Sequence, residues 1–136
     1  AQKYRLPQEV RDFIRSHHGT TRVEYFYHSH LNQNPTENGV ELLRNFSYNG
    51  PKPESKETAV VMIADSIEAA SRSLKLYSLE SLTDLVNKII DSKIQSKQFD
   101  NCNLTFNDLT KIRASLIHQL LHIYHTRIAY PEKNVI

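Results

Sequence analysis

The sequence contains little glycine, one cysteine, no tryptophan and no long apolar run. Three glycines, the absence of tryptophan and long segments with an apolar repeat of 3.6 residues predict an all-helical protein. The single Cys102 excludes a disulfide framework and fits a reducing cytoplasm. No segment approaches the roughly 20 apolar residues of a membrane-spanning helix, and no signal peptide precedes Tyr4. We therefore expect the chain as given to be soluble, without direct membrane insertion.

The sequence also lacks an excess of charge of either sign. Its formal net charge is +2, and the basic residues are dispersed along the chain. These features give no support to binding of a nucleic acid polymer or of an anionic membrane surface. The length of 136 residues fits one domain, residues 1–136, with room for a real core.

Apolar periodicity divides the chain into about five helices. We expect them within residues 1–18, opening at Pro7, and then at residues 22–31, 54–74, 79–98 and 105–129, with a short helical turn at residues 39–46. Pro131 follows the last of these segments and stops it. The sequence alone thus predicts an all-α fold.

Three of these helices have sequence signals for their first turn. Thr21 with Glu24, and Thr105 with Asp108, have the spacing of a capping box, in which each residue's side chain bonds the other's backbone N–H. Ser78 is the expected cap of the helix at residues 79–98. The first helix ends at Gly19, because glycine readily adopts the left-handed conformation of a helix end.

The helix at residues 54–74 is the most apolar segment and carries a carboxylate in its middle. Val60, Val61 and Ile63 precede Asp65, and this composition predicts a helix that is buried on most sides. A buried carboxylate without a partner is costly, so Asp65 needs a cation, strong hydrogen-bond donors or a metal ion. An intramolecular ion pair or a hydrogen bond to a neighbouring backbone group satisfies Asp65 equally well.

Two adjacent histidines, His17 and His18, stand at the expected end of the first helix. Neighbouring side chains of a helix diverge by about 100°, so the two imidazoles can serve one polynuclear site only where the helix ends and the backbone bends. Imidazole suits zinc, iron, nickel and copper, and manganese when carboxylates share the site. The pair alone is a weak signal and is more typical of exposed polar residues at a helix terminus.

Three further histidines, His118, His122 and His125, fall on one face of the last helix. Their spacing of four and three residues can chelate a metal ion. No carboxylate shares their stripe, and neighbours such as Leu116 and Leu120 form core. We interpret these histidines as boundary or surface residues rather than as ligands.

Arg72 lies two helical turns beyond Asp65 on the same face. A guanidinium group there can donate two hydrogen bonds to phosphate oxygen atoms. The alternative for Arg72 is a salt bridge to Glu68, one turn earlier on the helix. A carboxylate combined with imidazoles binds divalent metals and can activate water, so Asp65 and the paired histidines are the candidate ligands.

Four motifs together resemble one protein family. They are HHGT at residues 17–20, GPKP at residues 50–53 followed by the helix that ends in EAASRS, the DNCNLT turn at residues 100–105, and HTRIAYPEK at residues 125–133. The chain resembles the C-terminal part of the HD hydrolase domain of bacterial seven-transmembrane HD proteins, the cyclic di-AMP phosphodiesterases. The similarity covers nearly the whole chain, except an insertion-like stretch from about Asn32 to Asn45.

The resemblance implies an all-α HD-domain-like fold with a two-metal centre, commonly of iron or manganese. It implies hydrolysis of cyclic di-AMP to linear pApA by a hydroxide that the two metals activate. By matching motifs, His17, His18 and Asp65 take the role of metal ligands. Arg72 and Thr20 become candidate substrate contacts, with Thr20 also holding the HHGT turn. The parent protein would carry this domain on the cytoplasmic side of the bacterial inner membrane.

The sequence departs from the family pattern in one respect. HD enzymes are named for a His-Asp dyad that supplies a bridging carboxylate, and this sequence contains no HD dipeptide. We therefore expect the chain to be the C-terminal portion of the domain, inactive alone, with partial or no metal. The N-terminal half of the domain, or a second copy in a homodimer, would then cover its exposed apolar faces.

Two alternative functions fit the same residues. The first is a non-catalytic helical module that binds nucleotide or partner helices, in which His17→Ala and Asp65→Ala leave ligand binding by the complete domain intact. The second is an HD phosphohydrolase that acts on another nucleotide, because substrate choice depends on pocket shape, which the sequence does not show.

Overall fold

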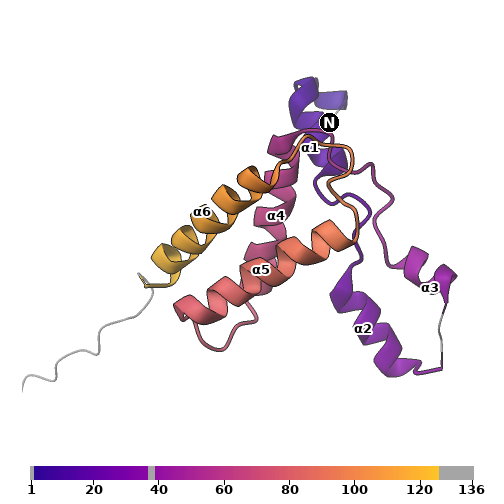
Figure 1. The fold of residues 1–136 in the computed structure, drawn as a ribbon. Coiled ribbons are helices and arrows are strands. Elements are labelled where there is room, and N and C mark those ends of the chain that lie inside the picture. Colours follow the sequence, from indigo (N-terminus) through magenta and orange to yellow (C-terminus); the bar gives the residue numbers. More distant parts are fainter. Residues whose placement is uncertain (1, 37–38, 126–136) are drawn as a thin grey trace, which may run out of the picture.

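The computed structural model describes residues 2–36 and 39–125, and its regular elements there are helices (Figure 1). In chain order they are a short 3₁₀-helix η1 (Gln2–Tyr4), α1 (Gln8–Ser16), α2 (Glu24–Gln33), α3 (Val40–Asn45), α4 (Lys56–Ser71), α5 (Leu79–Gln95) and α6 (Phe106–His125). The all-α prediction is confirmed, with the short turn α3 as the sixth α-helix of the described residues. No helix in this part of the chain is both long and apolar enough to cross a membrane.

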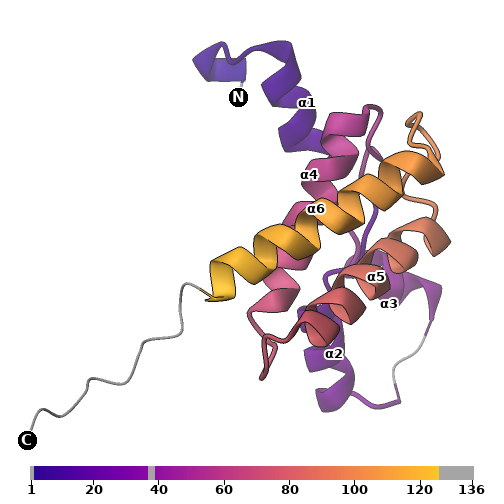
Figure 2. The ribbon, with the colours of Figure 1, turned by 60° about the vertical axis from the view of Figure 1, so that its left-hand side comes forward.

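Helices α4, α5 and α6 enclose the hydrophobic core. Helix α5 packs against both α4 and α6, and Figure 2 shows α6 crossing α4 and running alongside α5. The core side chains recur at helical spacing on the three helices: Ile63 and Ile67, then Leu82, Val86 and Ile90, then Leu109 and Leu120. Fully burying one such leucine or isoleucine contributes about 1.5–3 kcal/mol, so these three helices form the stable base of the fold.

Helix α4 lies inside its predicted range, and it is buried on one face only. The hydroxyl of Ser55 caps the helix by accepting a hydrogen bond of 3.2 Å from the Thr58 N–H. Its buried residues are Thr58, Ala59, Met62, Ile63, Ile67 and Ser71. The prediction of burial on most sides is wrong, because Val60 and Val61 are 36% and 39% exposed and Asp65 lies on the open face.

The connection between α1 and α2 pairs with the segment that follows α3. Arg22 and Ser47 form an isolated antiparallel bridge, and the Tyr48 N–H donates a hydrogen bond of 2.9 Å to the Thr21 carbonyl. These two segments are about 25 residues apart in the sequence. Their pairing brings Tyr48 next to the end of α1, where the two adjacent histidines lie.

The predicted capping box of α2 is wrong. The Thr21 hydroxyl donates instead to the His18 carbonyl at 2.7 Å, and the N-cap of α2 is Val23, without a side-chain hydrogen bond. The Glu24 carboxylate pairs with the guanidinium of Arg22 at 2.8 Å. Thr21 therefore stabilises the turn that contains the histidines rather than the helix that follows.

Helix α5 begins with a capping box and ends in a Schellman motif. The Ser78 hydroxyl accepts from the Ser81 N–H at 3.1 Å, which confirms Ser78 as the cap. At the other end, the Lys97 N–H donates to the Ile94 carbonyl at 2.9 Å, and the Gln98 N–H donates to the Lys93 carbonyl at 3.0 Å. Lys97 has a φ of +55° and so occupies the left-handed position that glycine usually fills.

The Schellman motif places the side chain of Gln98 against the turn after α1. Gln98 is only 2% exposed; its Oε1 accepts from the Thr20 N–H at 3.0 Å, and its Nε2 donates to the Thr20 hydroxyl at 3.0 Å. Gly19 has a φ of +56°, and a β-carbon there would clash with Gln98 Oε1 and lie 2.7 Å from the terminal methyl of Met62. Gln98 thus holds the histidine turn against α4 and α5.

Helix α6 begins with the predicted capping box. The Asp108 N–H donates to the Thr105 hydroxyl at 3.1 Å, and the Thr105 N–H donates to the Asp108 carboxylate at 3.0 Å. The same carboxylate accepts from Lys56 at 2.7 Å. The Lys56 hydrogen bond, followed by those from Thr105, lowers the pKa of Asp108. One carboxylate therefore ties the first turns of α4 and α6 together.

The histidines of α6 match the interpretation as surface residues where the structure describes them. His118 and His122 are exposed. The side chain of His125 and the predicted helix end at Ala129 lie outside the described residues.

Replacing Lys97 by glycine tests the strain in the Schellman motif. Glycine adopts a positive φ without the steric cost of a β-carbon, so Lys97→Gly raises the free energy of unfolding by about 0.5–1 kcal/mol. Lys88→Gly, the same change at an exposed position inside α5, lowers it by about 1 kcal/mol. Urea denaturation measures both, and a loss of stability in Lys97→Gly contradicts this account.

Replacing Gly19 by alanine tests the packing of the histidine turn. The left-handed backbone costs about 1–2 kcal/mol with a β-carbon, and the clash with buried Gln98 and Met62 adds about 1–3 kcal/mol. The matched variant Gly39→Ala meets no atom within 4 Å at a φ of +140° and carries only the backbone cost. Equal losses for the two variants in urea denaturation would refute the close packing at Gly19.

Candidate functional site

His17 and His18 lie where α1 ends, and the backbone turns there, as a site shared by both imidazoles requires. His17 is the C-cap of α1, and its Nδ1 lies 2.6 Å from the Phe13 carbonyl oxygen. A carbonyl only accepts, so Nδ1 carries a proton and Nε2 is the ring nitrogen available to a metal. A backbone carbonyl that fixes the tautomer of an imidazole in this way is the usual support of a metal-binding histidine.

His18 lies between two other rings. Its ring centroid is 3.9 Å from that of His17, and it stacks on Tyr48 at a centroid distance of 4.3 Å and an interplanar angle of 15°. The pairing of residues 22 and 47 positions Tyr48 for this contact. Sequence reasoning missed Tyr48 because no local pattern reports that pairing. Tyr48 restricts the orientation of the His18 ring.

Asp65 of α4 approaches His18 from the neighbouring helix. Its Oδ2 lies 3.8 Å from His18 Nδ1, and its side chain is 52% exposed. Burial, followed by the charge of His17, lowers the pKa of His18, and Asp65 opposes this effect. His18 is therefore neutral near pH 7, the form in which imidazole donates a lone pair to a metal. The expectation that Asp65 is buried is wrong. His18, which was predicted to share a metal site with Asp65, does lie next to it.

The three predicted ligands are close together without forming a closed metal site. Two imidazoles and one carboxylate are donors that suit divalent transition metals. Within residues 2–36 and 39–125, however, no three histidine, cysteine, aspartate or glutamate side chains are arranged to hold an ion. His17, His18 and Asp65 thus fit a metal in donor type and supply an incomplete set.

The two candidate substrate contacts have protein partners in this structure. The Thr20 N–H donates to the Gln98 side chain and the Thr20 hydroxyl accepts from it, which matches the expectation that Thr20 holds the turn. Arg72 donates from Nε and Nη2 to one oxygen of Glu68, at 2.9 and 2.6 Å. This is the salt bridge considered as the alternative for Arg72, on an exposed surface where such pairs are weak.

Sequence reasoning also missed Lys93. This residue of the last turn of α5 is half-buried and interacts electrostatically with Asp65 and Glu24. Burial lowers the pKa of Lys93, and the two carboxylates oppose this effect. Its position seven residues after buried Val86 and three after buried Ile90 continues the inner stripe of α5, which is the signal that could have found it.

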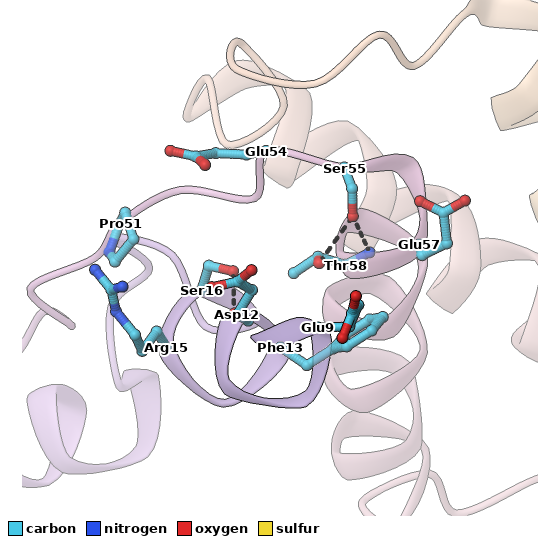
Figure 3. A pocket seen from close by; sticks show the side chains of 10 residues that line it. All are labelled: Glu9, Asp12, Phe13, Arg15, Ser16, Pro51, Glu54, Ser55, Glu57 and Thr58. Carbon is cyan, nitrogen blue, oxygen red and sulfur yellow. Dashed lines mark hydrogen bonds between the residues drawn. The ribbon is translucent and has the colours of Figure 1, made fainter. Parts of the chain in front are cut away.

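A separate pocket lies between α1 and the beginning of α4 (Figure 3). Its charged lining is mostly acidic, with the carboxylates of Glu9, Asp12, Glu54 and Glu57 and one cation, Arg15. Neither candidate histidine lines it. Carboxylates repel a phosphate, so this pocket is not the candidate phosphate site.

Comparison with curated proteins identifies close relatives. The chain is 42% identical over 130 residues to the cyclic-di-AMP phosphodiesterase PgpH of Bacillus subtilis, which covers 95% of the chain and 18% of that protein. It is 38% identical over 127 residues to PgpH of Listeria monocytogenes, covering 93% of the chain and 17% of the relative. The chain therefore spans less than a fifth of these relatives. No family model matches it.

Solved structures give the same relationship at the level of the fold. The HD domain of L. monocytogenes PgpH in complex with cyclic di-AMP matches with a TM-score of 0.81 and 35% identity, over 90% of this chain and 56% of that one. A second solved structure of the L. monocytogenes PgpH HD domain matches with a TM-score of 0.79 and 34% identity, over 91% of this chain and 56% of that one. The chain is homologous to the HD domain of the PgpH phosphodiesterases and corresponds to the C-terminal portion of that domain.

Proposed function

We propose that this chain forms the C-terminal portion of a metal-dependent phosphodiesterase domain that hydrolyses cyclic di-AMP to pApA. The observation that carries the proposal is the match, at a TM-score of 0.81 over 90% of the chain, to an HD domain crystallised with cyclic di-AMP. The two named relatives are cyclic-di-AMP phosphodiesterases. As part of such a protein, the chain would lie on the cytoplasmic side of the bacterial inner membrane.

In this proposal His17, His18 and Asp65 bind divalent metal. The Phe13 carbonyl directs the Nε2 lone pair of His17 away from α1, and the lowered pKa of His18 keeps that ring neutral. In the complete domain two divalent ions, iron or manganese, would be held with the help of these residues and would supply the Lewis acidity that activates water and neutralises charge on the phosphate. Arg72 can exchange its exposed partner Glu68 for a phosphate oxygen, and Thr20 keeps the turn in place.

The rest of the HD domain supplies the ligands that the described residues lack. The chain covers 56% of the solved domain, so a further segment of that domain is available to complete the site. Exposed apolar side chains on α1 and α4 offer a surface for it: Val10 at 41%, Ile14 at 53%, Val60 at 36% and Val61 at 39%. A homodimer is the other way of covering this surface. In either arrangement a single copy of the chain, without its partner, is inactive.

A non-catalytic binding module is the second candidate function. It is favoured by one observation, the absence of a three-ligand group among residues 2–36 and 39–125. A phosphohydrolase with another nucleotide as substrate is the alternative within the HD family. Substrate tests on the complete domain separate these functions.

Asp65→Asn tests the metal role in a protein that contains this chain together with the rest of its HD domain. We expect the Mn²⁺-loaded wild type to convert cyclic di-AMP to pApA, as followed by chromatography. Loss of an anionic ligand lowers kcat at least about 100-fold and reduces the bound metal measured by elemental mass spectrometry. The matched control Asp84→Asn changes an exposed carboxylate of α5 and leaves both values unchanged.

Four results would contradict the proposal in different ways. A metal-loaded wild type that does not hydrolyse cyclic di-AMP excludes the proposed activity. Hydrolysis of another nucleotide instead supports the alternative substrate. Full metal content and turnover in Asp65→Asn exclude Asp65 as a ligand. A binding module is identified if the wild type, His17→Ala and Asp65→Ala all bind cyclic di-AMP and none of them hydrolyses it.

A further inference from the structure

Lys93 is a cation that the fold holds at the candidate site. It lies on the inner stripe of α5 with Val86 and Ile90, so its side chain is half-buried rather than extended into solvent. A buried ammonium group is costly unless an anion or hydrogen bonds compensate it. Lysines that only solubilise a helix lie on the outer face, as Lys88 does.

The charges around Lys93 come from three different elements. Asp65 of α4 and Glu24 of α2 attract its ammonium group. His18 of the HHGT turn repels it electrostatically when the imidazole is protonated. Among the described residues, no carboxylate forms an ion pair with Lys93 within 4 Å, whereas Lys56 pairs with Asp108 at 2.7 Å. The charge of Lys93 is thus attracted from a distance and has no close anion.

The backbone of Lys93 is fixed relative to the histidine turn. Its carbonyl accepts a hydrogen bond of 3.0 Å from the Gln98 N–H, and the Gln98 side chain holds Thr20 through both of its polar atoms. Two consecutive contacts therefore join Lys93 to the turn that contains His17 and His18. A residue held in this way is pre-organised for a ligand that also meets the histidines.

We infer that Lys93 binds a non-bridging phosphate oxygen of the substrate, across from His18 and Asp65. An ammonium group is a compact charge that suits a single phosphate oxygen, and it keeps three donors available for it. Asp65 and Glu24 attract the ammonium group toward the site. The bound phosphodiester then supplies the close anion that Lys93 lacks among the described residues. This role rests on the proposed phosphodiesterase function and adds a substrate contact to it.

The test compares Lys93→Met, Lys93→Arg and Lys88→Met in the metal-loaded complete domain. Isothermal titration calorimetry with inorganic phosphate at low ionic strength measures the contact directly. A charge-assisted hydrogen bond corresponds to a loss of affinity of about 10- to 100-fold in Lys93→Met. We expect a rise of similar size in the KM for cyclic di-AMP, partial recovery in Lys93→Arg, and no change in Lys88→Met.

Metal content and stability separate a substrate contact from a structural charge. A substrate-binding lysine can be replaced by methionine without loss of bound metal and with an unchanged or raised midpoint of thermal unfolding, because a half-buried charge is removed. A lysine that serves only to balance Asp65 and Glu24 gives the opposite result, a lower midpoint with unchanged phosphate affinity. That outcome overturns the inference.

The two readouts also distinguish this inference from the proposed function. Phosphate affinity reports on Lys93 whether or not cyclic di-AMP is hydrolysed. If the wild type binds phosphate through Lys93 and does not hydrolyse cyclic di-AMP, the substrate assignment fails and the role of Lys93 stands. If the wild type hydrolyses cyclic di-AMP and Lys93→Met retains full phosphate affinity and KM, the inference fails alone.

Discussion

The candidate site depends on one buried amide, the side chain of Gln98. Its oxygen and nitrogen satisfy the N–H and hydroxyl of Thr20, so the turn after α1 is fixed to the end of a core helix. An amide buried to this extent must be fully hydrogen-bonded, and this requirement makes the position of the turn specific. The Schellman motif in turn places Gln98, which is why an unfavourable backbone angle at Lys97 is retained.

Local patterns were sufficient for the helices and for part of the site. Apolar spacing identified the core segments, because burial of one face against α5 is what stabilises them. The Thr105–Asp108 box formed as predicted, since both partners lie within one turn. The Thr21–Glu24 box did not form, because the Thr21 hydroxyl donates to the His18 carbonyl and the Glu24 carboxylate pairs with Arg22. The apolar sequence around Asp65 led to the wrong prediction that this helix is buried on most sides, because valines also occupy the open face of α4.

The residues that support the predicted ligands were beyond sequence reasoning. His17, His18 and Asp65 belong to recognisable motifs, but Tyr48 reaches His18 through a bridge between residues 22 and 47. Gln98 reaches Thr20 across 78 positions of the chain. Periodicity and capping rules describe neighbours within one helical turn, so contacts of this range become visible only in three dimensions. Lys93 had a local signal, its place on the inner stripe of α5, which is easily read as a solvated charge.

The separation between Thr20 and Gln98 also has a consequence for how the protein is made. During synthesis the histidines leave the ribosome long before residue 98 does. Until then the amide that fixes the HHGT turn does not exist, and closing so long a loop must await the docking of α5. The two predicted histidine ligands therefore reach their final geometry only late in biosynthesis, after most of the core helices have been translated.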